Sequence, residues 1–379
     1  MRNVVIAGYA RSPFHLAGKG ALARVRPDDL AAQVICGLIE QTGVKAEDIE
    51  DIVLGCAFPE GEQGLNVARL IGLLADLPLS VGGMTVNRFC GSSMSSVHIA
   101  AGQIQLGAGE AFICAGVEAM SRVPMMGFNP LPNPELAKKN AGAYMGMGDT
   151  AENVATKYQI SRAQQEAFAV ASQDKAAAAI AAGKLAAEIV PITTKAGVVD
   201  KDGTPRPGTT AEALAGLKPA FSQDGTVTAG TSSPLTDGAS AVLVTSEDYA
   251  REHGLPILAR IKSVAVSGCQ PEIMGIGPVE ASRKALVRAG LTVDQLDVVE
   301  LNEAFASQSL ACISDLGLDQ SKVNLDGGAI AIGHPLGATG ARIVGKAAAL
   351  LKREGGSYAL ATQCIGGGQG IATILEAAE

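Results

Sequence analysis

Aromatic residues are scarce in this chain, and tryptophan is absent. Phe, Tyr and Trp together make up 3% of the 379 residues, so other side chains must fill the interior. Ala, Val, Ile, Leu and Gly are the available residues, and the 46 glycines exceed the usual share of about 7%. So many glycines indicate tight turns and close approaches between backbone segments.

Positive charge is also in short supply, since 30 Lys and Arg residues face 38 Asp and Glu residues and leave a net charge of -8. The longest basic runs are the pairs Lys138–Lys139 and Lys352–Arg353. Binding to nucleic acid rests on clustered Lys and Arg, so we expect no nucleic-acid partner. Hydrophobic residues make up 47% and charged residues 18%, a balance that excludes a disordered chain.

Long apolar runs are missing as well. A membrane-spanning helix needs roughly 18 consecutive apolar residues, and the nearest candidate, residues 70–86, is interrupted by Asp76, Pro78 and Ser80. The first residues run directly into a strand-like segment, without the pattern of a secretory signal. We therefore expect no membrane insertion and a cytoplasmic protein.

The 7 cysteines form no C-x-x-C pair, and their odd number leaves one over. Neither a disulfide framework nor a zinc ribbon fits this arrangement. We expect most of them to be small buried hydrophobic residues.

Three segments of the chain differ in their patterns. Residues 4–119 alternate strand-like runs with helical ones, which predicts α/β layering. Residues 120–238 are rich in turns but contain one strong helix, Ser161–Ala182, that begins with a capping box. The segment from Ile257 to the end has α/β patterns again.

The first and third segments contain an apparent internal repeat. Three pairs of similar stretches follow one another in the same order, about 245 residues apart. They are EDIEDIVLGCAF with DQLDVVELNEAF, NRFCGSSMSSV with GAIAIGHPLGATGARIV, and AFICAGVE with YALATQCIGG. We interpret them as two similar α/β halves; chance similarity between Gly/Ala-rich segments is the alternative. With a true repeat, Cys90 and His334 begin equivalent helices near the seam between the halves, where ligand clefts are common.

Cys90 is the first candidate for chemistry. The strand-like stretch MTVNRF precedes it and the amphipathic stretch Ser92–Leu106 follows, so the thiol is predicted at a strand-to-helix turn. The positive end of a helix dipole can lower a cysteine pKa from about 8.5 to between about 3.5 and 7.5, and Gly91 leaves room for a substrate. The alternative is a buried structural cysteine. That structural role is the one expected for the cysteines within apolar patterns, Cys36, Cys56, Cys114, Cys269 and Cys312.

His334 lies in GGAIAIGHPLGATGAR, a loop too rich in glycine to pack, which favours a role as a base over a structural one. The other three histidines, His15, His98 and His253, are assigned no role. Cys364 in TQCIGGGQG ends a strand-like run and is followed by bare backbone whose N–H groups can face a developing oxyanion. A tight turn is the alternative for that segment. No G-x-S-x-G motif is present, so a serine hydrolase with a nucleophile elbow is not supported.

Six motifs therefore stand in one order along the chain: NRFCGSSMSSV, MGDTAENVA, GTVTAG with DGASAV, NEAFA, GGAIAIGHPLGATGAR and CIGGGQG. With them the sequence resembles the thiolase family over essentially its whole length. The resemblance implies two repeated α/β halves in a five-layered αβαβα arrangement with an inserted loop domain. The N-terminal half would comprise residues 1–119 and 239–250, the loop domain residues 120–238, and the C-terminal half residues 251–379.

The resemblance also implies roles for individual residues. Cys90 would be the nucleophile that accepts the acyl group, and His334 would deprotonate it. Cys364 would act as the second acid/base, and Asn302 of NEAFA would hold a water that stabilises the enolate oxygen together with His334. The backbone N–H groups of Cys90 and Gly366 would form a second oxyanion hole. A polarisable thiolate is a strong nucleophile near neutral pH, which suits attack on a 3-ketoacyl thioester.

Coenzyme A is a substrate by this resemblance, and neither a metal nor a permanently bound cofactor is implied. Arg206 would approach its adenine and Ser233 its pantetheine amide. The tunnel would be lined by Met147, Phe221, Ala304 and Phe305.

Two positions bear on the subtype. Acetoacetyl-CoA-specific thiolases have a His before the residue that matches Met147, whereas this chain has Gly146, as in broad-range 3-ketoacyl-CoA thiolases. It also has Thr231 where the biosynthetic relatives have Asn. Five of the 9 methionines fall within residues 120–147, where flexible thioethers could line an adaptable acyl channel or fill gaps in a loop domain.

The main hypothesis from the sequence is a 3-ketoacyl-CoA thiolase of fatty-acid β-oxidation, working through an acyl-Cys90 intermediate. The close alternative is an acetoacetyl-CoA thiolase that condenses two acetyl-CoA molecules, and a remote one is a non-catalytic acyl-CoA-binding protein. The resemblance also implies a homodimer or homotetramer, with another β-oxidation enzyme as a candidate partner.

Overall fold

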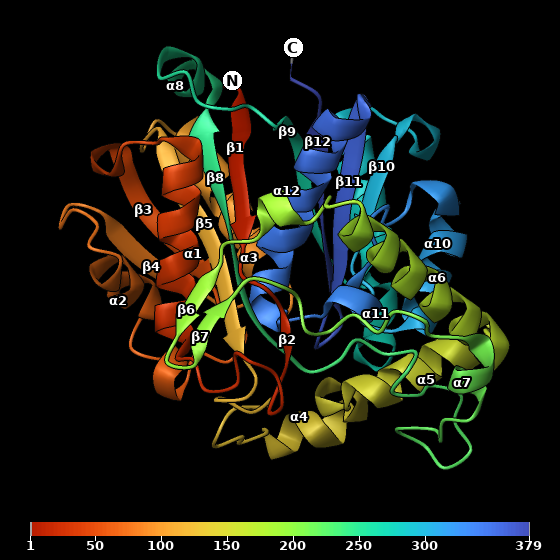
Figure 1. Cartoon of the computed structure of the whole chain (residues 1–379). Coiled ribbons are helices and arrows are strands. Elements are labelled where there is room, and N and C mark those ends of the chain that lie inside the picture. Colours follow the sequence, from red (N-terminus) through yellow and green to blue (C-terminus); the bar gives the residue numbers. More distant parts are fainter. Residues whose placement is uncertain (1, 379) are drawn as a thin grey trace.

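The computed structural model describes residues 2–378 and contains one large mixed sheet (Figure 1). It has 10 strands, and all but the short β2 (His15–Leu16) follow the order β10-β11-β12-β9-β1-β8-β5-β3-β4. A separate two-stranded sheet joins β6 (Ile192–Thr194) and β7 (Gly197–Val199). Helices pack against the large sheet from both sides, so the predicted α/β class is confirmed.

The large sheet consists of two strand groups that share the topology of four strands, and the first group has β4 in addition. The first contains β1 (Val4–Arg11), β3 (Ile49–Gly55), β4 (Gly82–Val86), β5 (Ala111–Ala119) and β8 (Thr236–Ser246). The second contains β9 (Ala259–Gly268), β10 (Val298–Leu301), β11 (Tyr358–Ile365) and β12 (Gln369–Glu376). The parallel pair β3·β5 corresponds to β10·β11, and the antiparallel pairs β5·β8 and β8·β1 correspond to β11·β12 and β12·β9. The internal repeat predicted from the sequence is therefore confirmed.

The helices form three layers around the two strand groups (Figure 1). The outer layers are α1 (Pro27–Thr42) with α2 (Val67–Leu74), and α9 (Gly277–Ala289) with α10 (Ala306–Leu316). The middle layer is α3 (Ser92–Gln105) with α12 (Leu336–Glu354). Three large hydrophobic clusters fill the spaces between these layers, which gives the αβαβα order. Edge to edge, the strand groups meet through the antiparallel pairs Val5–Arg260 and Ile6–Ala259.

The central strands show where the aromatic-poor composition is used. Every residue of β1, β5 and β8 is buried, because helices cover both faces of these strands. Small and β-branched residues dominate them, and such residues let helices pack closely on a pleated surface.

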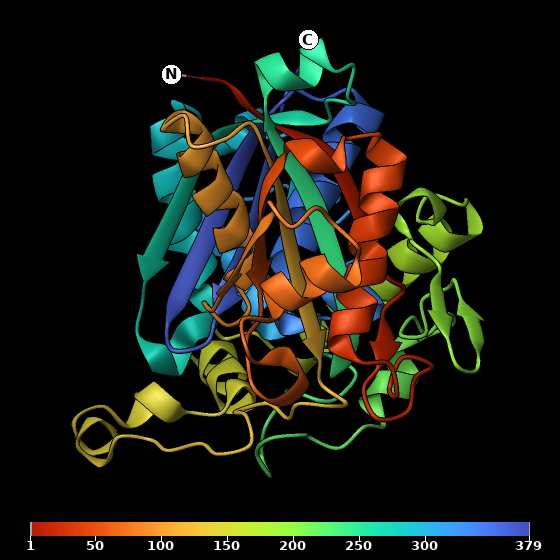
Figure 2. The same cartoon turned by 90° about the vertical axis from the view of Figure 1, so that its left-hand side faces the viewer.

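The segment between β5 and β8 contains α4 (Pro134–Lys139), α5 (Met147–Lys157), α6 (Arg162–Ala181) and α7 (Ala211–Ala215). Figure 2 shows α4 in a loop that projects from the body of the molecule. The predicted capping box of Ser161 and Gln164 is present at the start of α6. Two short helices complete the fold, α8 (Glu247–Glu252) and α11 (Ala329–Ile332).

Two local predictions from the sequence were wrong. The strand predicted over MTVNRF ends at Val86, because the chain turns at Phe89, whose φ is 44°. Cys36 is exposed on α1 and Cys269 is only partly buried, so neither is the buried core residue expected, whereas Cys56, Cys114 and Cys312 are buried as expected. Between residues 2 and 378, no helix is both long and apolar enough to span a bilayer.

Candidate active site

Cys90 and His334 stand at the beginnings of the two middle helices. Each lies two residues ahead of its helix, since α3 begins at Ser92 and α12 at Leu336. The helices cross in close contact, because Gly340 of α12 has no side chain where it meets the backbone of Met94 in α3. The Ala341 N–H also donates to Ser93 Oγ at 2.8 Å. The predicted equivalence of the two helices is confirmed, and their positive ends lie at the same side of the crossing.

The turn before α3 holds Cys90 in a strained position. Phe89 has a φ of 44°, in the left-handed region that non-glycine residues seldom occupy. Backbone hydrogen bonds fix the turn, from Gly91 N–H to Arg88 O at 2.9 Å and from Ser92 N–H to Phe89 O at 3.1 Å. A strained backbone conformation of this kind persists where many surrounding contacts hold it in place, and such positions are common at functional sites.

The Cys90 thiol is buried, and its surroundings shift its pKa in opposite directions. The Gly366 backbone N–H donates to its sulfur, and Gln363 Nε2 donates to its carbonyl oxygen. Burial, and then the Glu118 carboxylate, raise the pKa of Cys90 to about 12. This direction is opposite to the lowering expected from the helix dipole, because desolvation outweighs the dipole. Cys90 therefore rests as a thiol, and a base must remove its proton.

His334 is a buried imidazole with both ring nitrogens in contact. Its Nδ1 lies 2.6 Å from Thr339 Oγ1, and its Nε2 lies 3.4 Å from Asn302 Nδ2. Burial, together with the positive charge of Arg342, lowers the pKa of His334 to about 3. The ring is neutral at physiological pH, and the amide facing Nε2 leaves the proton on Nδ1. A neutral imidazole with an unprotonated Nε2 can act as a general base.

Asn302 presents an unsatisfied acceptor to the same space. The residue follows β10, and its backbone N–H donates to Thr362 O at 3.0 Å. Its side-chain Oδ1 is buried with no hydrogen-bond partner, as is Oε1 of Gln363. Buried acceptors of this kind are normally paired, so a water or substrate donor is expected to meet them.

Cys364 lies near the end of β11, with Gly370 opposite it in the hairpin to β12. The side chain is 1% exposed, and burial raises its pKa well above the usual value, with a further contribution from nearby Cys90. The structure therefore pairs two protonated thiols, Cys90 and Cys364, and pairs a neutral imidazole with an amide, His334 and Asn302. Together they can form and break a thioester and move protons on both sides of it.

Comparison with known proteins identifies the family. The family model for the thiolase N-terminal domain matches residues 4–248, and the model for the thiolase C-terminal domain matches residues 255–377. The chain belongs to the thiolase family. A 3-ketoacyl-CoA thiolase from Bacillus subtilis is 48% identical over 99% of this chain and 100% of the relative. One from Pseudoalteromonas translucida is 50% identical over 99% of each.

Solved thiolase structures also superpose closely. The crystal structure of the Bacillus anthracis acetyl-CoA acetyltransferase has a TM-score of 0.93 and 41% identity, covering 100% of this chain and 99% of that one. Human mitochondrial 3-ketoacyl-CoA thiolase in complex with CoA has a TM-score of 0.92 and 39% identity, covering 100% of this chain and 98% of that one. These matches confirm the thiolase fold.

Most of the residues predicted to contact CoA in this thiolase lie together beside Cys364. One apolar cluster contains Cys364, Ala304 and Phe305, with Met147 packed against it. The Phe221 ring meets the Phe305 ring edge-on at 5.9 Å, and Ser233 N–H donates to Ala304 O at 3.0 Å.

Arg206 is the exception among them. It lies on an exposed turn, where its backbone N–H donates to Gln173 Oε1 at 2.8 Å. Within residues 2–378, no hydrogen bond joins Arg206 to the cluster around Phe305. Its contact with adenine stays a prediction.

Sequence reasoning missed several residues of this thiolase site. Glu118 and Gln363 have no motif of their own, although each is a polar residue within an otherwise apolar buried strand. That pattern is a usable signal, because a buried carboxylate or amide needs partners. Thr339 was missed because its contact with His334 depends on the first turn of α12.

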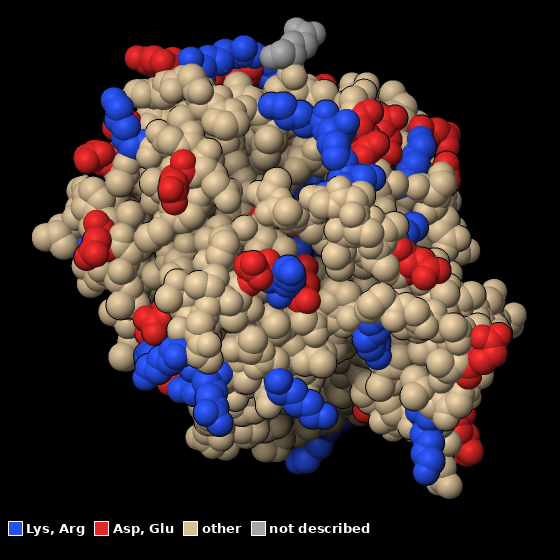
Figure 3. All heavy atoms as spheres, in the orientation of Figure 1, with Lys and Arg blue, Asp and Glu red and all other residues tan. Residues whose placement is uncertain are grey.

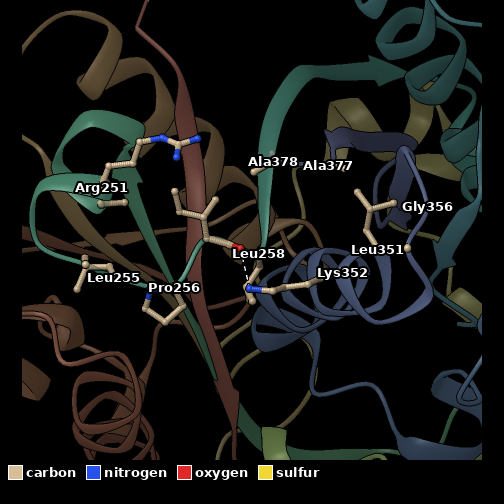
Figure 4. A pocket seen from close by; sticks show the side chains of 13 residues that line it. Arg251, Leu255, Pro256, Leu258, Leu351, Lys352, Gly356, Ala377 and Ala378 are labelled. Atoms are coloured by element: carbon tan, nitrogen blue, oxygen red, sulfur yellow. Dashed lines mark hydrogen bonds between the residues drawn. The ribbon is translucent and has the colours of Figure 1, made fainter.

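A cavity of about 750 Å³ lies at the other end of α12 (Figure 4). The lining includes Leu258, Leu351 and Lys352, whose Nζ donates to Ile257 O at 3.2 Å. Because α12 has 19 residues and each adds about 1.5 Å, this cavity is about 28 Å from His334 along the helix. None of the predicted site residues lines it.

Proposed function

We propose that this thiolase cleaves 3-ketoacyl-CoA with CoA to acetyl-CoA and a shortened acyl-CoA, as a 3-ketoacyl-CoA thiolase of fatty-acid degradation. The observation that carries the proposal is that Cys90 and His334 precede the two crossing helices, with Cys364 near Cys90 and Asn302 against His334. The names of the full-length relatives from Bacillus subtilis and Pseudoalteromonas translucida support the same activity.

In the first half-reaction the proton of the Cys90 thiol passes to His334, and the thiolate attacks the 3-keto carbon. The bond between the α and β carbons breaks, its electron pair goes to the α carbon, and Cys364 protonates that carbon to release acetyl-CoA. An acyl thioester on Cys90 remains. In the second half, Cys364 thiolate takes the proton of an incoming CoA thiol, whose sulfur attacks the thioester. The Cys90 thiolate that leaves recovers its proton from His334.

Two oxyanion sites support these steps. The Gly366 N–H, which lies against the Cys90 sulfur, and the Cys90 N–H would stabilise the tetrahedral intermediate. A water held by Asn302 and His334 would stabilise the enolate of acetyl-CoA. The unsatisfied Asn302 Oδ1 supports this assignment, because it can accept a hydrogen bond from such a water.

The CoA chain would enter beside the apolar cluster of Met147, Ala304 and Phe305, with Phe221, Ser233 and Arg206 further out. Figure 3 shows mainly Lys and Arg on the lower part of the face it displays, where the loop segment lies. A basic rim favours approach of the anionic phosphates of CoA. CoA is a substrate in this proposal and is not permanently bound.

Substrate comparison tests the subtype. The alternative, an acetoacetyl-CoA thiolase that condenses acetyl-CoA, is favoured by the similarity to the Bacillus anthracis acetyl-CoA acetyltransferase. Turnover should be measured with acetoacetyl-CoA and with 3-ketoacyl-CoA substrates of eight to sixteen carbons. We expect activity with the longer substrates, and activity confined to the four-carbon substrate would contradict the degradative assignment.

A non-catalytic acyl-CoA-binding protein is the remaining alternative. Mass spectrometry after incubation with acetyl-CoA decides this point, since the proposed reaction passes through a thioester. We expect an acetyl adduct on the peptide that contains Cys90. The absence of that adduct would favour simple binding.

The proposal also includes a homo-oligomer. Strand β4 is the edge of the sheet, and the leucines around it are exposed, Leu65, Leu70, Leu73, Leu74 and Leu79. An exposed edge strand with apolar neighbours favours pairing with a second copy. Sedimentation analysis should give a dimer or tetramer, and a monomer at micromolar concentration would contradict it.

The cytoplasm is the proposed location, where thiols stay reduced. The seven cysteines all lie within the described part of the chain and are free, which supports a reducing compartment. A second enzyme of fatty-acid degradation stays a proposed partner.

A further inference from the structure

Glu118 is a buried carboxylate with no role in the proposed reaction. It lies on β5, is 1% exposed, and forms no ion pair within residues 2–378. Its Oε2 accepts from Ala57 N–H at 2.8 Å and from Gly337 N–H at 3.0 Å. Its Oε1 accepts from Gln63 Nε2 at 2.8 Å and from Phe58 N–H at 3.3 Å. Burial raises the pKa of Glu118, and these four N–H donors oppose that rise because each favours the ionised carboxylate.

The donors come from the first turn of α12 and from the loop after β3, which packs against the Cys90 turn. Gly337 lies in the first turn of α12, three residues after His334. The Phe58 ring packs on the ring of Phe89, the residue before Cys90, with centroids 5.8 Å apart. Glu118 therefore connects the His334 turn with the loop that supports the Cys90 turn.

The approach of Gly337 to Glu118 depends on the missing side chain. A Cβ on Gly337 would lie 2.8 Å from Glu118 Oε2 and 2.8 Å from Cys56 Cα, which is too close for either. The carboxylate thus sits at the positive end of α12, where negative charge is stabilising. This contact fixes the start of the helix in one position relative to β5.

We propose that Glu118 is a positioning residue for thiolysis, whose carboxylate fixes the first turn of α12, and with it His334, relative to Cys90. This inference rests on the proposed function. Glu118 has a second effect through its charge. Around Cys90 the ionisable neighbours are Glu118 from β5 with Cys56 beside it, Cys364 from β11, and His334 before α12. The negative charge of the ionised Glu118 carboxylate raises the pKa of Cys90 beyond the effect of burial, so it favours the protonated thiol.

Three variants separate position from charge. Glu118→Gln keeps the shape and removes the charge, Glu118→Asp keeps the charge and shortens the side chain, and Gln63→Met removes one neutral donor as a matched control. Each is measured for kcat and KM with a 3-ketoacyl-CoA, for folding by thermal unfolding, and for alkylation of the Cys90 peptide by iodoacetamide across pH.

We expect kcat to fall at least about tenfold in Glu118→Gln and Glu118→Asp with KM within about twofold, because a 1 Å misplacement of a reacting group is sufficient for such losses. The alkylation midpoint should move to lower pH in Glu118→Gln and stay unchanged in Glu118→Asp and Gln63→Met. A folded Glu118→Gln with wild-type kcat and midpoint overturns the proposal. Should that variant not fold, wild-type kcat in folded Glu118→Asp overturns it instead. A wild-type protein that fails to cleave 3-ketoacyl-CoA would refute the proposed function and with it the positioning role, whereas loss of kcat confined to the Glu118 variants leaves the proposed function intact.

Discussion

Replacing Gly340 by alanine tests the crossing of α3 and α12 on which the active site depends. A Cβ at this position would lie 2.8 Å from Met94 Cβ and 2.9 Å from Met94 Cα, and closer still to the Met94 backbone nitrogen. Backbone cannot rotate away as a side chain can, so one of the two helices must move. Because Cys90 and His334 precede these helices, that movement changes the distance between them.

The expected loss of stability follows from two opposing effects. Overpacking a closed core costs roughly 1 to 3 kcal/mol, and contact with backbone places Gly340→Ala at the upper end. The higher helix propensity of alanine offsets about 1 kcal/mol, which leaves a net loss of about 2 kcal/mol. With an unfolding entropy of roughly 2.1 cal/mol/K per residue, a chain of 379 residues should then melt about 2 to 3 °C lower.

Gly102→Ala is the matched control for this variant. Gly102 is an exposed glycine in α3, and a Cβ there meets nothing within 4 Å. The free energy of unfolding of the control should rise by up to about 1 kcal/mol, and its activity should be unchanged. The kcat of Gly340→Ala should fall at least about tenfold. Differential scanning calorimetry and steady-state kinetics measure both. A Gly340→Ala protein that melts at or above the wild-type temperature with full kcat would refute the idea that backbone contact sets the crossing.

Three further predictions concern single side chains. Cys90→Ser should abolish acyl transfer and the acetyl adduct. Cys364→Ser should still form the adduct but should lose exchange of the acetyl α-protons, which is followed by NMR in deuterated water. Exchange at the wild-type rate in Cys364→Ser would contradict the role of Cys364. Glu300→Ala leaves Arg342, its buried partner at 3.0 Å, without a counter-charge, and the free energy of unfolding measured in urea should fall by about 3 to 5 kcal/mol. The control is Glu280→Ala in the exposed pair with Arg283, which should change that free energy by less than about 1 kcal/mol. The pKa of His334 is lowered from 6.5 in the unfolded chain to about 3 in the folded protein. Between these pH values only the unfolded chain binds the proton. The contribution of His334 to stability is therefore complete above pH 6.5 and is lost as the pH falls toward 3. Urea unfolding across pH should therefore show a shallower acid dependence in His334→Asn, and identical slopes would contradict the lowered pKa.

Local sequence signals predicted much of the fold. The start of α6 was predictable because a capping box is formed by neighbours in sequence, Ser161 and Gln164. The repeat was predictable because both halves keep the same strand and helix order, and the positions of Cys90 and His334 before their helices followed from it. The motifs then indicated the residues that would meet.

Long-range contacts account for the predictions that failed. The pKa of Cys90 depends on burial and on Glu118, which comes from another strand, and these outweigh the local effect of the helix dipole. The end of β4 depends on a turn that Phe89 adopts despite its positive φ. Similarly, the exposure of Cys36 depends on which face of α1 the sheet covers, and the apolar pattern around it did not distinguish the two faces.

The shared middle layer has a consequence for how the chain folds. One hydrophobic cluster holds Met94 and Val97 of α3 together with Ile343 and Val344 of α12, while strands of both halves cover it. Neither half can therefore exclude water from its inner face by itself, even though each carries a full set of strands. We expect the two halves to unfold in one cooperative step, and either half produced separately to aggregate through its uncovered side. The ancestral form of such a repeat would for the same reason have been stable only as a pair of identical chains.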